Sequence, residues 1–251
     1  MRRLGVWSAA ALIVAAAGVA GAAEQTVSYK SGEESVSGLL VTPDGKGPFP
    51  AVIVIHEWWG LDAWVKDQAR ALGREGYVAL AVDLYRGRVT DKQEEAHQFM
   101  SGMPEDRAMR DLKAALAHLR SRKDVRADRI GVIGWCMGGK YALKLATEEP
   151  SLAAAVAYYG APPTDAAAIA RIKAPVLGSF GAEDTGPSPE QVKAFEAAMK
   201  AAGKSVDVKL YPGAGHAFAN VNNPWKGYRE EAAKDAWSRA TAFFARHLKK
   251  G

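Results

Sequence analysis

The stretch Ile133-Gly134-Trp135-Cys136-Met137-Gly138-Gly139-Lys140 decides the fold, because it turns a strand into a helix around a reactive side chain. The apolar run 130–133 predicts a buried strand, and the apolar spacing after Lys140 predicts a helix. Between them lies Gly-x-Cys-x-Gly, the nucleophile-elbow pattern with Cys136 in place of serine. Flanking glycines permit the sharp turn, and the helix N-terminus favours a thiolate. The alternative is that Cys136 is a small buried apolar residue beside a glycine turn.

Strands and helices alternate on both sides of this elbow. The expected strands are 27–30, 35–42, 51–55, 77–82, 130–133, 154–159, 175–180 and 206–210. The expected helices are 62–75, 91–100, 104–120, the elbow helix, 189–202 and 229–249. This alternation predicts an α/β fold with a mostly parallel central sheet and helices on both faces. Because no repeat or linker interrupts the pattern, we expect a single domain over residues 24–251.

The N-terminus is typical of a secretory signal peptide over residues 1–23. It has a basic start at Met1-Arg2-Arg3, an apolar stretch over 9–19 and small residues over 20–23. We expect cleavage after Ala22 or Ala23, by the general or the twin-arginine route, and export to the periplasm. The apolar stretch is too short and too rich in alanine and glycine to be a good membrane-spanning helix.

Composition narrows the class of protein further. The 251 residues are 48% hydrophobic and 24% charged, which suits one globular domain with a sizeable core. Loss of Arg2 and Arg3 with the signal peptide lowers the formal net charge from +5 to +3. Since no basic run is present, we expect neither a nucleic-acid partner nor stable membrane association, and we expect a monomer.

The cysteine count favours a thiol that is either functional or buried. Cys136 is the only cysteine, so it has no intramolecular disulfide partner in an oxidising compartment. No spacing of His, Cys and acidic residues indicates a metal site, and no cofactor is expected.

In a parallel sheet the active site lies at the carboxyl ends of the strands. Polar residues follow five of the expected strands, at His56 and Glu57, at Asp83, Tyr85, Arg86 and Arg88, at Cys136, at Asp184, and at His216. The order nucleophile, acid, histidine along the chain is that of α/β-hydrolases. His216 would hold the thiol proton and deliver it to the leaving group, and Asp184 would orient the imidazole. Glu183 is the neighbouring candidate for the acid, and the shorter Asp184 is preferred.

Five segments of the sequence together resemble the dienelactone hydrolase family of α/β-hydrolases. They are Ile55-His56-Glu57-Trp58-Trp59-Gly60, Asp83-Leu84-Tyr85, Gly134-Trp135-Cys136-Met137-Gly138-Gly139, Gly181-Ala182-Glu183-Asp184 and Gly215-His216-Ala217-Phe218. The resemblance implies a triad of Cys136, Asp184 and His216. It also implies that Glu57 interacts with the resting thiol and helps to generate the thiolate. The N–H groups of Met137 and Trp58 would form the oxyanion hole.

Two positions depart from the arginine pattern of this family. Members that act on dienelactone carry an arginine four residues after the catalytic histidine, where this chain has Asn220, and another where it has Gly87 between Arg86 and Arg88. An asparagine lacks the cationic fork that binds a carboxylate, which argues against dienelactone as the physiological substrate. We expect a pocket for a small ester or lactone, lined by Trp58, Trp59, Tyr85, Trp135 and Phe218 and flanked by Arg86 and Arg88.

The sequence therefore predicts an exported, cofactor-free hydrolase that cleaves a carboxylic ester or lactone through an acyl-cysteine intermediate. Three other functions stay open at this point. The protein could be a binding protein that keeps the pocket with little turnover, or a sensor that uses the activated thiol of Cys136. A transacylase is the third, because acceptors other than water can intercept an acyl-enzyme.

Overall fold

The computed structural model describes residues 22–249, so the signal peptide expected over residues 1–23 lies almost wholly outside the described residues. The first strand begins at Ala23, which pairs with Thr42. No helix within residues 22–249 is long and apolar enough to cross a membrane.

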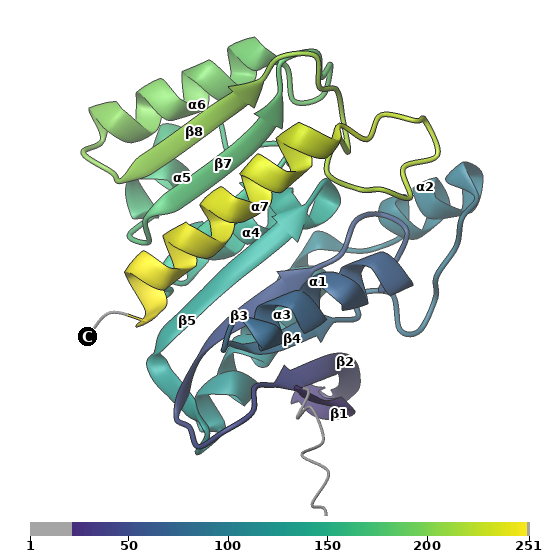
Figure 1. Ribbon diagram of the computed structural model, residues 1–251, viewed down its shortest axis with the longest axis vertical. Helices are drawn as coiled ribbons and strands as arrows, with labels where there is room; N and C mark the ends of the chain where they lie inside the picture. Colours follow the sequence, from purple (N-terminus) through teal and green to yellow (C-terminus); the bar gives the residue numbers. More distant parts are fainter. Residues whose placement is uncertain (1–21, 250–251) are drawn as a thin grey trace, which may run out of the picture.

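The structure is built on one eight-stranded sheet with the strand order β1-β2-β4-β3-β5-β6-β7-β8 (Figure 1). The strands are β1 (Ala23–Ser31), β2 (Glu34–Thr42), β3 (Phe49–Ile55), β4 (Val78–Val82), β5 (Val125–Trp135), β6 (Ala154–Tyr158), β7 (Val176–Gly181) and β8 (Val206–Tyr211). The β1–β2 and β2–β4 pairs are antiparallel and all other pairs are parallel. The mostly parallel sheet predicted from the sequence is confirmed.

Helices cover both faces of this sheet (Figure 1). They are α1 (Ala63–Arg74), α2 (Gln93–Ser101), α3 (Glu105–Ser121), α4 (Met137–Glu148), α5 (Ala166–Arg171), α6 (Pro189–Ala201), α7 (Glu230–Phe244) and the π-helical turn η1 (Ala245–Lys249). Apolar residues of α1 and α7 form the core on one face, and those of α3, α4, α5 and α6 form the core on the other. Within β3, Val52 and Val54 point to the first core and Ile53 and Ile55 to the second, as strand alternation requires.

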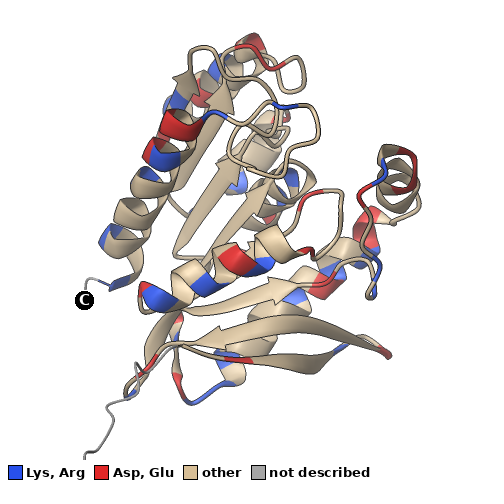
Figure 2. Ribbon diagram, turned by 45° about the vertical axis from the view of Figure 1, so that its right-hand side comes forward, with Lys and Arg blue, Asp and Glu red and all other residues tan. Residues whose placement is uncertain are grey.

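The outer faces of the helices carry charges of both signs. On α7, Lys234 pairs with Glu230 and Asp235 pairs with Lys209, and Figure 2 shows acidic and basic bands along the same helix. Such exposed pairs add little to stability, and they leave no run of a single sign on this helix.

Three elements differ from the sequence expectation. Helix α5 was missed, because its six residues are too short to show a helical period, although Asp165 caps it by accepting from the Ala168 N–H. The helix expected over 229–249 changes to a π-helical turn after Phe244. Strand β5 begins at Val125, five residues earlier than the apolar run, because Phe49 of β3 extends the pairing to that residue through an irregularity.

Candidate active site

The sharp turn predicted around Cys136 connects β5 to α4. Cys136 has φ 52° and ψ −118°, a strained backbone conformation for a residue with a side chain. Glycine is required on both sides of it. A Cβ at Gly134 would lie 2.1 Å from the carbonyl oxygen of Gly138, and a Cβ at Gly138 would lie 2.3 Å from that of Ile55. The turn therefore presses the start of α4 against the carboxyl end of β3.

The three side chains proposed as a triad lie in one hydrogen-bonded row. His216 Nε2 is 3.1 Å from Cys136 Sγ, and His216 Nδ1 is 2.8 Å from Asp184 Oδ2. The other oxygen of Asp184 accepts a hydrogen bond of 2.8 Å from the N–H of Gly186. Glu183 is exposed, so the buried Asp184 is the acid that orients the histidine.

The charge of His216 follows from its two partners. Burial alone lowers its pKa, but the hydrogen bonds to Asp184 and Cys136, and the charges of those groups, raise the pKa of His216 to about 10. An imidazole with that pKa is protonated at neutral pH. Its Nε2 lies 3.1 Å from Cys136 Sγ, the position of an acid–base partner beside a nucleophile.

The loop that follows His216 holds the imidazole in place. The side-chain amide of Asn223 donates to the carbonyl oxygens of His216 and Ala217, at 3.2 and 3.1 Å. Ala217 has a positive φ of 56°, and the N–H of Arg229 donates to the carbonyl of Phe218. His216 therefore lies at the start of a compact, internally hydrogen-bonded loop.

The two backbone N–H groups expected to form an oxyanion hole are those of Met137 and Trp58. Met137 is the first residue of α4, so its N–H has no partner within the helix. The N–H of Trp58 makes no hydrogen bond to any of the described residues. Because Gly138 packs against the carbonyls of Ile55 and His56, the segment of Trp58 and the start of α4 are neighbours.

Glu57 differs from the expectation drawn from the family. Among residues 22–249, its Oε2 accepts a hydrogen bond of 2.6 Å from Asn220 Nδ2, while its Oε1 has no partner. The structure thus pairs the thiol with His216 and pairs Glu57 with Asn220. Burial raises the pKa of Glu57 to about 7, against the opposing effects of Asn220, Tyr159 and His216.

His56 holds the backbone at Glu57 from the other side. Its Nε2 accepts a hydrogen bond from the N–H of Leu84, so its Nδ1 carries the proton and donates to the carbonyl of Glu57 at 2.5 Å. Burial lowers the pKa of His56, which keeps the ring neutral. A neutral histidine thus ties the ends of β3 and β4 together.

Tyr159 is a site residue that the sequence reasoning missed. It follows β6, is fully buried with a positive φ of 37°, and its ring centroid lies 5.2 Å from that of His216. Its hydroxyl lies close enough to lower the pKa of Glu57, although the two groups form no hydrogen bond of normal geometry. The available signal was its position at the carboxyl end of the expected strand 154–159.

The residues expected to bind substrate occupy different places. Trp135 packs against Trp64 and Tyr158, and Phe218 packs against Tyr159 and Tyr211, so both are core residues. Tyr85 is fully buried, and its hydroxyl donates to Met137 Sδ. The expectation that these three side chains line the pocket is corrected accordingly, because all three are buried among core side chains and none lines the pocket described below.

The two arginines are also bound elsewhere. Arg86 pairs with Asp111 and Glu34 at 2.7 and 3.0 Å. Arg88 donates to the carbonyl of Tyr85 and stacks over the ring of Phe99. These contacts join neither guanidinium to Cys136, His216 or Asp184. No contact therefore supports the expectation that the two arginines flank the substrate.

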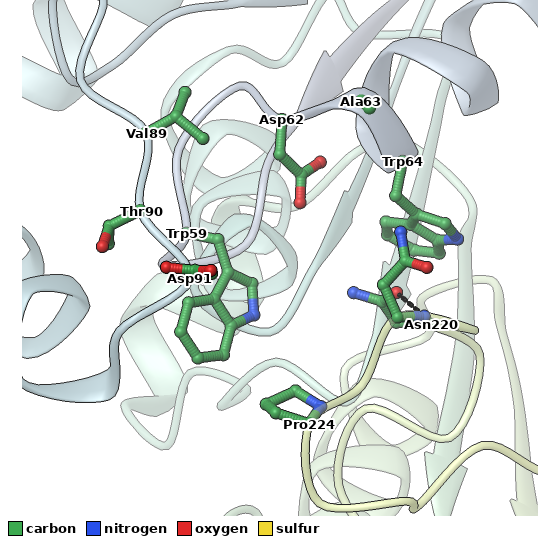
Figure 3. A pocket seen from close by; sticks show the side chains of 10 residues that line it. Trp59, Asp62, Ala63, Trp64, Val89, Thr90, Asp91, Asn220 and Pro224 are labelled. Carbon is green, nitrogen blue, oxygen red and sulfur yellow. Dashed lines mark hydrogen bonds between the residues drawn. The ribbon is translucent and has the colours of Figure 1, made fainter.

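Of the expected substrate-binding residues, Trp59 alone lines the pocket in Figure 3. This pocket, called here the Trp59 pocket, has a volume of about 460 Å³. It is lined by Trp59, Asp62, Ala63, Trp64, Val89, Thr90, Asp91, Asn220, Asn222 and Pro224. Asn220 lines this pocket and also donates a hydrogen bond to the carboxyl group of Glu57. Within the described residues, no group of three or more His, Cys, Asp or Glu could hold a metal ion.

Comparison with known proteins places this geometry in a family. The model of the dienelactone hydrolase family matches residues 36–248. A protein from Methylorubrum extorquens named "Putative carboxymethylenebutenolidase" is 35% identical over 219 residues, covering 82% of this chain and 75% of that protein. A Bradyrhizobium protein named "Probable 2-oxo-3-(5-oxofuran-2-ylidene)propanoate lactonase" is 31% identical over 228 residues, covering 86% and 91%.

Solved structures agree with this placement. A dienelactone hydrolase-like promiscuous phosphotriesterase from metagenomic libraries superposes with a TM-score of 0.84 at 27% identity, covering 91% of this chain and 100% of that chain. The family match spans both the elbow and the histidine loop. The chain therefore belongs to the dienelactone hydrolase family and is a hydrolase acting on carboxylic ester or lactone bonds.

Proposed function

We propose that the protein hydrolyses small carboxylic esters or lactones through a covalent acyl-cysteine intermediate on Cys136. The observation that carries this proposal is the hydrogen-bonded row from Cys136 Sγ through His216 to Asp184, at 3.1 and 2.8 Å, on a strained turn. A nucleophile, a base and an orienting acid in contact are the requirement for acyl transfer.

In the first half of the reaction, the thiolate of Cys136 attacks the carbonyl carbon of the substrate. The carbonyl oxygen takes up the electron pair and is stabilised by the N–H groups of Met137 and Trp58. As the tetrahedral intermediate collapses, the bond to the leaving oxygen breaks and His216 Nε2 donates its proton to that oxygen. An alcohol leaves, or the ring of a lactone opens, and a thioester remains.

In the second half, water attacks the thioester. His216, now neutral, accepts a proton from the water as the new bond to the carbonyl carbon forms. The carbon–sulfur bond then breaks, the carboxylic acid leaves, and Cys136 and His216 return to the thiolate and imidazolium pair. Asp184 keeps Nδ1 protonated in both halves, because its Oδ2 accepts from that atom.

The test is steady-state hydrolysis of p-nitrophenyl acetate and a panel of simple lactones. We expect turnover by the wild-type protein and none by Cys136→Ala, with unchanged circular dichroism. Cys136→Ser is the matched variant, because it places a hydroxyl instead of a thiol at the elbow and tests whether a thiolate is needed. Full activity of Cys136→Ala would overturn the proposal, and acetylated alcohols among the products would instead identify a transacylase.

We also propose that the protein is exported to the periplasm as a monomer. The basis is the sequence of residues 1–23, with its basic start, apolar stretch and small residues. N-terminal sequencing of protein from a periplasmic extract should begin at Ala23 or Glu24, and light scattering should give the monomer mass. Recovery of an uncleaved chain from the cytoplasm would contradict export.

A further inference from the structure

The Trp59 pocket has an acidic wall. Asp62 and Asp91 line it, and within the described residues no lysine or arginine does. Lys66 on α1 lines a separate hollow, and Lys92 pairs with Glu95 at 3.0 Å. The lining itself therefore carries negative charge and no cationic side chain, which favours a cation and disfavours a carboxylate, although Lys66 acts on Asp62 from outside the pocket.

Asp62 caps a helix with its carboxylate and also lines the pocket. Its Oδ1 accepts the N–H of Val65 at 2.9 Å and so caps α1. Figure 3 shows its carboxylate pointing into the pocket between the rings of Trp59 and Trp64. Burial raises the pKa of Asp62, so the ionised carboxylate is only partly compensated by the protein and would gain from a bound cation.

Aromatic rings complete the chemistry of a cation site. Trp59 and Trp64 line the pocket, and the ring of Trp225 lies 5.9 Å from that of Trp59. Tryptophan faces attract ammonium groups, and quaternary ammonium ligands are bound by such rings together with carboxylates. The exposed large apolar side chains of the described chain are Val89, which lines the pocket, and Val221 and Trp225, which lie in or beside the lining segment 220–224.

The pocket adjoins the catalytic row through two side-chain contacts. Asn220 lines the pocket and donates to Glu57, the buried carboxyl group that follows β3. Asn223, in the loop that forms the other wall, donates to the carbonyl of His216. The loop that carries Asn220 and Asn223 is therefore shared by the wall of the pocket and the support of the catalytic row.

We propose that the Trp59 pocket binds an organic ammonium group of the substrate, so that the enzyme prefers esters with a positively charged group to neutral or carboxylate-bearing ones. This inference rests on the hydrolase function proposed above. It gives Asp62 and Asp91 the role of specificity-determining residues. The proposed substrate carries a positive charge, whereas a carboxylate-bearing lactone carries a negative one.

The experiment compares three acetate esters of nearly equal shape. They are the ester of choline, the ester of 3,3-dimethylbutan-1-ol, in which carbon replaces the quaternary nitrogen, and the ester of 3-hydroxypropanoate, which carries a carboxylate. We expect kcat/KM to fall in that order, with the difference between the first two mainly in KM. We also expect that difference to shrink as potassium chloride is raised, because salt screens exposed charges.

Charge-removing variants assign the preference to this pocket. Asp62→Asn keeps a side chain that caps helices well, and Asp91 makes no hydrogen bond to the described residues. Each of Asp62→Asn and Asp91→Asn should lower the choline preference by about two- to fivefold, the value of a partly exposed charge pair. Asp44→Asn is the matched control, because Asp44 is exposed before β3, at the opposite edge of the sheet. It should keep the wild-type preference.

Equal kcat/KM for the choline and dimethylbutyl esters would overturn the subsite, and so would an unchanged preference in both pocket variants. Failure of the proposed function is a separate result, because Cys136→Ala would then still hydrolyse all three esters. A direct binding measurement distinguishes failure of the ammonium subsite from failure of the hydrolase function. Calorimetry with choline chloride and Cys136→Ala should detect binding that 3,3-dimethylbutan-1-ol does not reproduce and that Asp62→Asn weakens, and its absence would also overturn the subsite.

Discussion

The two buried carboxylates of the site, Asp184 and Glu57, show how partners decide what a buried acid does. Both oxygens of Asp184 are used, by His216 and by the N–H of Gly186. Glu57 has one oxygen bound to Asn220 and the other without a partner, and burial raises its pKa to about 7. Complete partnering fixes the direction of the carboxylate, as a positioning acid needs. Incomplete partnering leaves an acid that changes charge near neutral pH.

The largest expected effect comes from the fully partnered acid. Asp184→Asn should lower kcat for p-nitrophenyl acetate by about 10³-fold or more, because the amide can donate to Nδ1 and so favours the wrong imidazole tautomer. Glu183→Gln, a change of the same type on the exposed neighbour, should stay near wild type. Normal turnover by Asp184→Asn would remove the distinction between the two carboxylates.

The second prediction concerns pH and Glu57. Its pKa is about 4.5 in the unfolded chain and about 7 in the folded one, so the folded state holds the proton more tightly. The contribution of Glu57 to the free energy of unfolding therefore falls by about 3 kcal/mol as the pH rises between these two values. Above pH 7 this contribution stays at its lower value.

Glu57→Gln cannot ionise, so it should lack this part of the pH dependence. Urea unfolding of the wild type and of Glu57→Gln between pH 4.5 and 8 measures the difference in their free energies of unfolding. All other titrating groups are the same in the two proteins. Parallel stability curves would mean that Glu57 is not the group that titrates.

A smaller effect is expected from the single partner of Glu57. Asn220→Ala removes a hydrogen bond to a buried carboxyl group and should cost about 1.5–3 kcal/mol at pH 8, with a further rise in the pKa of Glu57. Asn222→Ala, in the same loop but exposed, is the control and should stay within about 0.5 kcal/mol of wild type. Equal losses in urea unfolding would point to a general effect on the loop instead.

The smallest effect separates two neighbouring tyrosines. Neither the Tyr158 nor the Tyr159 hydroxyl makes a hydrogen bond of normal geometry to the described residues, so replacing either by Phe should change stability by less than about 1 kcal/mol. Only Tyr159 lies near Glu57, so only Tyr159→Phe should move the pKa of Glu57 upward. Identical pH–stability curves for the two variants would contradict this.

The sequence was sufficient for features that depend on chain order. Cys136, Asp184 and His216 each follow a strand of a parallel sheet, and such strands all end at one edge. It was insufficient for features that depend on side-chain direction or on distant partners. Trp135 adjoins the nucleophile in sequence, yet its strand position turns its ring to Trp64 and Tyr158. The partner of Glu57 is 163 residues away, and no local pattern identifies it.

Asn220 illustrates the difference between what the sequence and the structure can reveal. Sequence alone indicated what Asn220 lacks, namely a guanidinium for a carboxylate. The structure adds what it does, since its amide donates to Glu57 Oε2 at 2.6 Å, while the hydrogen bond to the thiol of Cys136 is made by His216. The acidic wall of the Trp59 pocket was likewise out of reach, because Asp62 and Asp91 belong to two different loops.

The most direct test of the catalytic row is mass spectrometry of protein quenched in acid within the first turnover with p-nitrophenyl acetate. We expect one acetyl group per chain, located at Cys136 by peptide mapping, and its loss over later turnovers. The adduct should accumulate in His216→Gln if any acylation remains, because that variant lacks the base for deacylation. A turning-over enzyme with no acyl group on Cys136, or with the acetyl group on another residue, would contradict the account.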